Sequence, residues 1–406
     1  MSSPAPRRSS GGGRESAGGR DGSGRETGRG GESGGRDWVG GGESGGGRDS
    51  RGVPVLRTRL TQLTGVRCPI VQTGMGFVSG AGLTSATARA GGLGILGSAT
   101  MTMAELQTAI ALVQERTDAP FGVNLRADAP DAAERIELLI SRGVRVASFA
   151  LAPQRDMIAR LKDAGVIVIP SVGARRHAEK VAAWGADAVI VQGGEGGGHT
   201  GPVPTSLLLP QVTSAVDIPV IAAGGYFDGR GLVAALAYGA EGIAMGTRFL
   251  LTTDSAVAAP VKQVYLDTPL TGTVVTTRVD GVPHRVLRTP LVDGLERSGQ
   301  ISGLARSVRN AAGFRKLSGL SWPQLLRQGR AMRQDTELSW GQVLMAANTP
   351  VLLRAAMVDG RPDLGVMAAG QVAGLIEDLP SVTELIERIM AEAASVLGRL
   401  DRLTES

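Results

Sequence analysis

The segment from Gln192 to Gly201, with the sequence QGGEGGGHTG, holds the residues of this chain best suited to chemistry. Ordering so many glycines costs backbone entropy that a structural turn would rarely need, so the glycines indicate that a substrate or a flat aromatic ring approaches this backbone closely. His199 would then project over that group, and an imidazole titrates near the pH at which most enzymes work. The segment therefore predicts an acid/base role for His199, with an ordinary exposed loop histidine as the alternative.

Two shorter glycine motifs indicate an anion site. The run PVIAAGG ends in Gly224 and Gly225, and the run GIAMGTRFL contains Gly246 followed by Thr247. Glycines allow backbone N–H groups to approach an anion closely, and the hydroxyl of Thr247 adds a donor. These turns therefore predict a phosphate site, with plain tight turns as the alternative.

The other histidines and the cysteine form no recognisable centre. His177 falls in a helical stretch and is expected to be solvated, the role of His284 is left open, and Cys68 before Pro69 fits a buried structural thiol. These residues are far apart in the sequence, neither H-E-x-x-H nor C-x-x-C occurs, and no G-x-S-x-G elbow follows an apolar run. Without a metal or an activated nucleophile, an organic cofactor bound through phosphate is the leading means of catalysis.

These groups need a scaffold, and the periodicity after residue 53 supplies one. Short β-branched apolar runs alternate with helical stretches, as in βαβ units with buried parallel strands. Eight such runs close a (β/α)8 TIM barrel, whose active site lies at the C-terminal strand ends, where the glycine motifs fall. The rival is a doubly wound sheet, but its G-x-G-x-x-G turn is missing. The predicted strands span residues 69–75, 93–97, 121–125, 144–150, 166–172, 188–194, 219–225 and 242–250.

The flanking segments differ from the barrel in texture. Residues 1–52 repeat Gly, Arg, Ser and Glu and are predicted to be a disordered tail. The alternative is that translation begins at Val53 or Val55 and that residues 1–52 are an artefact. The barrel would span 53–259, and 260–350 would form an inserted lid or small subdomain, helical and basic from Leu304 to Met345. Residues 351–406 would be a helical segment that packs on the barrel or on a second copy of the chain.

The composition narrows the partners. The chain carries 43 Lys and Arg against 38 Asp and Glu, a net charge of +5 that is too diffuse for a nucleic-acid groove. The sequence has no apolar run long enough for a membrane span, and one cysteine suits a reducing cytoplasm. We therefore expect a cytoplasmic protein with a small-molecule substrate, no specific nucleic acid and no membrane, and leave homo-oligomer formation open.

Six motifs in order, PIVQTGMG, AGGLGILGS, PFGVNL, VQGGEGGGHTG, IPVIAAGG and AMGTRFL, resemble the nitronate monooxygenase (2-nitropropane dioxygenase) family. Enzymes of this family are FMN-dependent TIM barrels, and flavin enoyl reductases belong to it. The resemblance implies FMN as the cofactor and His199 as the catalytic histidine. It also implies that FMN is contacted by Asn124, Gln192, Gly197, Gly224, Gly225, Ala244, Met245, Gly246 and Thr247.

Within this family the sequence is similar to an actinobacterial branch marked by VQTGMG, TVVTTRVDGVPHRVLRT and VLMAANTP. The branch resembles a flavin-dependent dehydrogenase of steroid catabolism, which oxidises a ring hydroxyl of a bicyclic hydroindane carboxyl-CoA. QTGMG in place of a Pro-Met-Ala-Gly motif, and AAGQVAGL without a tyrosine, depart from typical nitronate monooxygenases. Arg278, Arg285 and Arg288 of the insert would meet the CoA phosphates, with solvated surface as the alternative.

Three functions remain open on the sequence. In the favoured one, a dehydrogenase, His199 takes the hydroxyl proton of a CoA thioester substrate while hydride moves to the flavin. In the second, a nitronate monooxygenase, the same histidine removes a carbon-bound proton from an alkyl nitronate before O2 reacts. In the third, a flavin- or nucleotide-binding module has no catalytic activity and its Gly/Arg tail recruits RNA.

Overall fold

The computed structural model describes residues 47, 52, 54–150, 153–279, 281–297, 350 and 352–404. The chain divides into two units, Met1–Gly45 and Gly46–Ser406, and the described residues belong to the second. Most of the predicted tail and the whole of the predicted helical stretch from 304 to 345 lie outside the described residues.

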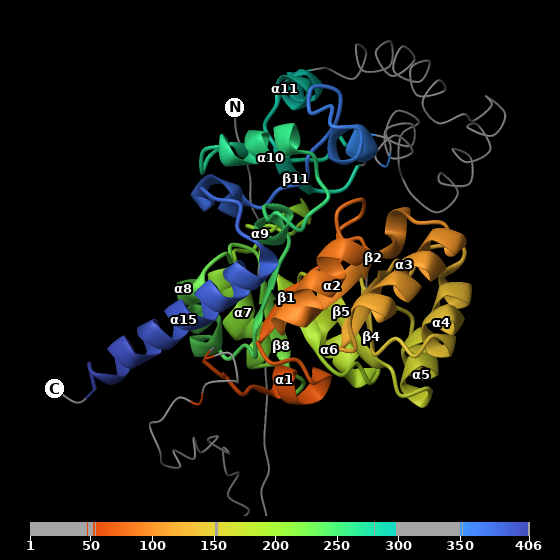
Figure 1. Ribbon diagram of the computed structural model, residues 1–406, viewed down its shortest axis with the longest axis vertical. Helices are drawn as coiled ribbons and strands as arrows, with labels where there is room; N and C mark the ends of the chain where they lie inside the picture. The colour runs from red at the N-terminus through yellow and green to blue at the C-terminus, as the bar shows by residue number, and fades with distance from the viewer. Residues whose placement is uncertain are drawn as a thin grey trace, which may run out of the picture. The chain divides into compact units, whose positions relative to one another are not determined.

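Eight parallel strands close into a barrel in the order β1-β2-β3-β4-β5-β6-β8-β9 (Figure 1). The ring closes where Val71 of β1 pairs with Ala244 of β9. Each strand falls within one of the eight predicted runs, so the TIM barrel prediction is confirmed. The strands are β1 Ile70–Gln72, β2 Leu93–Gly97, β3 Phe121–Leu125, β4 Val146–Phe149, β5 Ile167–Val172, β6 Val189–Gln192, β8 Val220–Ala223 and β9 Ile243–Met245.

An outer helix follows each of the first seven barrel strands and leads to the next strand. The outer helices begin and end where the sequence supplies caps: Thr102 and Glu105 form a capping box at the start of α3. Gly143, Gly165 and Gly185 have φ of 65°, 75° and 96°, so they follow their helices in the left-handed conformation that glycine adopts without strain. These helices are α2 Ala81–Ala90, α3 Met103–Arg116, α4 Ala132–Ser141, α5 Arg155–Asp163, α6 Arg175–Ala183, α7 Thr205–Thr213 and α8 Gly229–Ala237, with η1 Ser98–Thr100 before α3.

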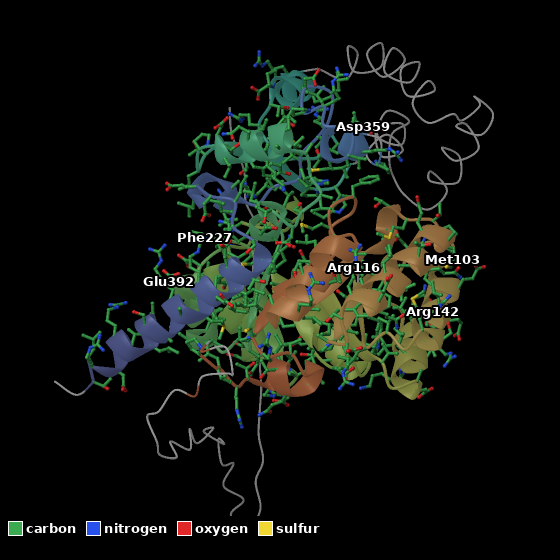
Figure 2. The ribbon with its side chains drawn as sticks, viewed as in Figure 1. Met103, Arg116, Arg142, Phe227, Asp359 and Glu392 are labelled. Carbon is green, nitrogen blue, oxygen red and sulfur yellow. The ribbon has the colours of Figure 1, made fainter. Side chains whose placement is uncertain are left out.

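The eighth outer helix comes from the end of the chain. The strand β9 leads only into the short α9 (Thr247–Leu250), and α15 (Val382–Asp401) packs against α8 and α2 instead (Figure 1). At this contact Glu392, labelled in Figure 2, accepts a hydrogen bond of 2.8 Å from the backbone N–H of Gly229. A Cβ atom at Gly229 would lie 2.4 Å from the Ala393 nitrogen, so glycine is needed for α8 and α15 to lie this close.

Between β9 and α15 the chain builds what we call the cap, the described residues of 259–297 and 352–376. The cap contains α10 (Ala259–Leu266), β10 (Thr273–Thr276), β11 (His284–Leu287), α11 (Pro290–Arg297) and η2 (Gln371–Leu375). In Figure 1 it lies beyond one end of the barrel. A third strand, β7 (Gly198–His199), leaves the barrel loop and joins β10 and β11 in an antiparallel sheet. The glycine segment is therefore part of both the barrel and the cap.

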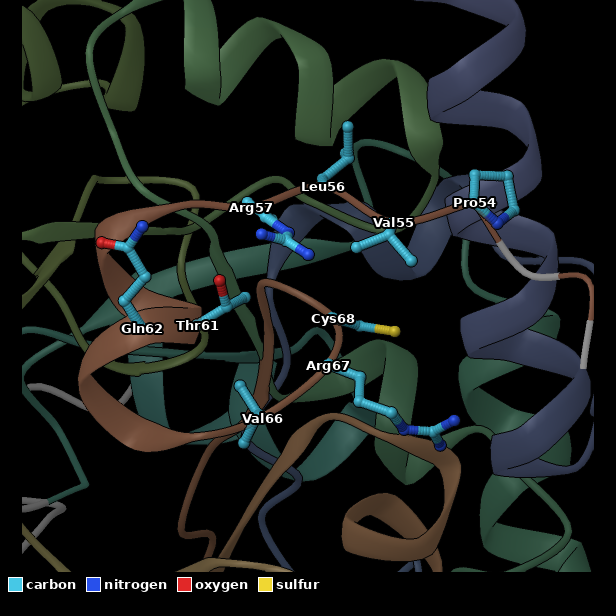
Figure 3. A pocket seen from close by; sticks show the side chains of 9 residues that line it. All are labelled: Pro54, Val55, Leu56, Arg57, Thr61, Gln62, Val66, Arg67 and Cys68. Carbon is cyan, nitrogen blue, oxygen red and sulfur yellow. The ribbon is translucent and has the colours of Figure 1, made fainter. Parts of the chain in front are cut away.

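The other end of the barrel has a cavity of about 300 Å³ beside α1 (Arg59–Thr64), shown in Figure 3. It is lined by residues 54–57, by Thr61 and Gln62, and by residues 66–68, which precede β1. Cys68 is 3% exposed here, as predicted for a structural thiol. This cavity lies at the N-terminal strand ends, away from the catalytic end of a TIM barrel. Among the described residues, no helix has the length and apolar character needed to cross a membrane.

Candidate active site

A polar layer lies above the apolar interior of the barrel. Val146, Ile169 and Ile190 belong to one interior cluster of buried residues. Because side chains alternate along a strand, the residues two positions later, Ser148, Ser171 and Gln192, face the same interior at the C-terminal ends. By the same alternation Asn124, the second-last residue of β3, faces the interior, and its amide donates to the hydroxyl of Ser148 at 3.3 Å. Asn124 and Ser148 are 7% and 1% exposed.

The glycine segment folds back over β6 and is held by side chains on both sides. The Gln192 amide donates to the carbonyl of His199 at 2.8 Å. The Glu195 carboxylate accepts from the backbone N–H and the hydroxyl of Thr205 at 2.9 and 2.7 Å, at the start of α7. The backbone from 192 to 199 is thus fixed by its own protein contacts.

Protein atoms, rather than a ligand, account for three of the glycines in this segment. A Cβ atom added to Gly193 would lie 2.0 Å from the Thr205 hydroxyl, and one added to Gly196 would lie 2.6 Å from the Gln192 amide. A Cβ atom added to Gly197 would lie 2.6 Å from the backbone of the cap at residues 369–370. The expectation that a bound group makes these glycines necessary is therefore wrong at these three positions. The close neighbours are a helix start, a neighbouring side chain and the cap.

His199 lies where the barrel loop and the cap meet. It pairs with His284 across the antiparallel strands β7 and β11, and the two ring centroids are 4.7 Å apart with the planes inclined by 46°. The His199 residue is exposed, whereas His284 is 4% exposed. The sequence left His284 open, and the structure places it beside the predicted acid/base residue.

A carboxylate in the loop after β3 interacts electrostatically with His199. Asp128 is held by Arg126 through hydrogen bonds of 2.9 and 2.6 Å. These bonds and the Arg126 charge hold the pKa of Asp128 below its usual value, and the charge of His199 adds to this effect.

The predicted anion turns have the conformations that glycine allows. Gly224 and Gly225 have φ of 98° and 84°. At Gly225 the nearest atom to a built Cβ is the Cβ of Glu195 at 3.6 Å, an ordinary contact, and the residue is exposed. The Thr247 hydroxyl accepts from the Gly370 N–H at 2.9 Å, which leaves its own proton for another acceptor. These residues fit a phosphate, with backbone room on one turn and a hydroxyl donor on the other.

The three insert arginines differ in their surroundings. Arg285 donates to the carbonyl of Gly194 at 2.8 and 3.2 Å and to the hydroxyl of Thr273 at 2.9 Å. Its guanidinium therefore joins the cap to the glycine segment and is not oriented toward an outside ligand. Arg278 and Arg288 are exposed, and Arg288 lies 3.5 Å from Asp293.

Sequence reasoning missed Ser148, Ser171 and Asp128. The alternation in VASF and in IVIPSV would have placed both serines on the interior face of their strands, one step beyond the last apolar side chain. Asp128 has no comparable signal, since it lies in a loop. Among the residues described, no three His, Cys, Asp or Glu side chains gather as a metal site would require.

The chain resembles several known proteins. A family model described as nitronate monooxygenase matches residues 57–137 and 132–392. The (3aS,4S,5R,7aS)-5-hydroxy-7a-methyl-1-oxo-octahydro-1H-indene-4-carboxyl-CoA dehydrogenase of Mycobacterium tuberculosis is 64% identical over 86% of this chain and 99% of its own length. The protein of the same name from Rhodococcus jostii is 60% identical over 86% and 98%. The structure of FabK from Thermotoga maritima is similar with a TM-score of 0.70 and 35% identity, over 86% of this chain and 99% of that one.

Proposed function

The chain belongs to the nitronate monooxygenase family of flavin-dependent oxidoreductases, and on that premise we propose that it is an FMN-dependent dehydrogenase of a hydroxylated bicyclic carboxyl-CoA. The observation that carries the substrate class is the 64% identity, over nearly its whole length, to a relative whose name specifies a 5-hydroxy-octahydroindene carboxyl-CoA. The single cysteine is buried and suits a protein of the reducing cytoplasm.

The FMN fits the residues at the C-terminal strand ends. The backbone of Gly224 and Gly225 would bind its phosphate, with room at the exposed Gly225, and Gly246 and Thr247 lie on the adjacent turn. Its ring would be held by Asn124, Gln192, Gly197, Ala244 and Met245. When bound, the flavin supplies the acceptor for the hydride that leaves the substrate.

His199 is the base in this proposal. It is exposed at the strand ends, and the Gln192 amide fixes the backbone that carries it. In this proposal the imidazole takes the substrate proton and becomes positive. The remaining polar side chains, Asn124 and Ser148, are buried and act by orientation.

The substrate class offers two dehydrogenations. A base can remove the hydroxyl proton while hydride leaves the carbon that bears the hydroxyl, which yields a ketone. It can instead remove the proton on the carbon beside the thioester carbonyl while hydride leaves the next carbon, which yields a conjugated enoyl thioester. Hydroxyl oxidation is the step suggested by the sequence branch. The resemblance to a family that includes flavin enoyl reductases is the reason to test the second step as well. Arg278 and Arg288, exposed on the cap, are proposed to meet the CoA phosphates.

The test is anaerobic flavin bleaching. The purified protein should be yellow, and a bicyclic 5-hydroxy carboxyl-CoA should bleach it while an alkyl nitronate should not. The spectrum and mass of the product then separate a ketone from an enoyl thioester. Bleaching by the nitronate alone would establish the nitronate monooxygenase instead, and a yellow protein that neither compound bleaches would favour a binding module.

A further inference from the structure

The cap brings a second imidazole to the proposed base. His284 begins β11 and lies directly opposite His199 of β7, so both side chains lie on the same face of this small sheet. Their ring centroids are 4.7 Å apart. This placement follows from strand register, which the next hydrogen bond confirms: the Thr200 N–H donates to the Pro283 carbonyl at 3.1 Å.

The ring of His284 lies in a buried part of the cap. It is 4% exposed, and two further residues of β11, Val286 and Leu287, are fully or almost fully buried. The cap therefore holds this ring in place, and it offers the exposed ring of His199 a fixed surface to pack against.

Two charged side chains bear on the pair. Asp128, held by Arg126 in the loop after β3, interacts electrostatically with His199. Arg285 follows His284 on β11, but its guanidinium is turned to Gly194 and Thr273. The ring of His284, by contrast, lies directly beside the ring of His199.

We propose that His284 is a positioning residue for His199. The ring of His284, which belongs to the cap, holds the exposed imidazole of His199 over the C-terminal ends of the barrel strands. The inference rests on the proposed role of His199. Catalytic groups lose activity steeply when they are displaced, and an error of about 1 Å can cost about 10²-fold in rate. Without the neighbouring ring, the side chain of His199 would be free to turn toward water.

Two variants at His284 separate ring contact from other effects. His284→Ala should slow flavin reduction at saturating substrate by about 10- to 10²-fold, with little change in KM and none in flavin content or reoxidation rate. His284→Phe keeps a flat ring in the same register and should recover most of the rate. Val275→Ala on β10, an exposed position that pairs with Arg285, is the matched cap control and should behave as the wild type.

The outcomes distinguish this inference from the proposed function. If His284→Ala reduces its flavin at the wild-type rate while His199→Ala is slow, the positioning role is wrong and the base assignment stands. If His284→Phe is as slow as His284→Ala, with flavin and melting temperature intact, ring contact is not the property that matters and the proposal is overturned. A raised KM with lost flavin in His284→Ala, not rescued by Phe, would show that His284 only stabilises the cap, which also overturns it.

Discussion

The barrel and the cap hold the active site in different ways. Asn124, Ser148 and Gln192 lie on strands that are paired with a neighbour on each side, so many backbone hydrogen bonds fix each of them. The cap is held to the site by a few contacts between distant residues. Arg285 bonds to Gly194, 91 residues away, and Gly370 bonds to Thr247, 123 residues away.

This difference indicates a division of labour. Changes to the barrel loops should remove the chemistry or the cofactor, because we assign the base and the phosphate turns to these loops. Changes to the cap contacts should leave the cofactor bound and reduce the rate, because the cap only orients the base. The following experiments test this division, from the largest expected effect to the smallest.

His199→Ala should slow flavin reduction by about 10²- to 10⁴-fold, or about 3 to 5 kcal/mol of transition-state stabilisation, because the base is lost. The barrel and flavin content should be unchanged, and the reoxidation rate should be that of the wild type. Stopped-flow absorbance under anaerobic conditions measures both half-reactions. His177→Ala on α6 is the control, since it removes a histidine elsewhere. A His199→Ala protein with wild-type reduction and pH profile would remove His199 as the base, and His284 would be tested next.

Gly225→Leu should give a colourless protein. The position has φ of 84° and is exposed, and its Cβ position makes only an ordinary contact with Glu195, so a leucine side chain would occupy the room assigned to the phosphate. Gly165→Leu is the matched control, because its φ of 75° imposes a similar backbone strain with nothing within 4 Å of its Cβ position. Flavin per chain is measured by absorbance. A Gly225→Leu protein fully loaded with flavin would show that the phosphate lies elsewhere.

Gly197→Ala should separate the cap from the glycine segment. The new methyl group would lie 2.6 Å from the backbone at residues 369–370, so one of the two segments must move. We expect retained flavin and a rate about 10-fold to 10²-fold lower, since the ring of His199 moves relative to the cap. Gly201→Ala is the control, because its nearest atom lies at an ordinary 3.7 Å. Equal rates for both variants would contradict the view that the cap orients the base.

Asp378→Asn should lower stability modestly and in a pH-dependent way. Arg388 and Arg248 hold the pKa of Asp378 below its usual value, so its contribution is present above pH ~3.9 and is lost as the pH falls through the lower folded value. Since Asp378 is 45% exposed, solvent screens the pair and the effect at neutral pH is about 1 kcal/mol. Thermal melts should show a gap between variant and wild type that closes toward low pH. A constant gap would exclude the carboxylate charge as its cause.

Deletion of residues 1–45 should change nothing that can be measured in flavin content, melting temperature or reduction rate. The segment has almost no aliphatic residues for a core, and the 64% identical relative is matched over 99% of its length by 86% of this chain. A large fall in any of the three quantities would show that the segment contributes to the enzyme.

The barrel could be predicted from the sequence because each βα unit is formed by residues that are close together in the chain. The apolar runs set the strands, and the residues that follow them, among them His199 and Gly225, fall at the C-terminal ends by position alone. Their roles toward FMN stay predictions. The cap could not be predicted in this way. The strand β7 forms only by pairing with β11, and the paired residues His199 and His284 are 85 residues apart in the sequence. Neither the closeness of residue 369 to Gly197 nor the inward turn of Arg285 has a local signal.

The late position of α15 has a consequence for how the protein is made. Its buried face, from Val382 to Ala393, covers the groove between α2 and α8, yet this helix leaves the ribosome only after the whole cap. Until then the nascent barrel exposes an apolar surface on its outer wall, a state that invites aggregation and chaperone binding. A truncated mRNA that ends before the codons of α15 should therefore yield a chain that quality-control proteases remove, even though all eight barrel strands have been translated.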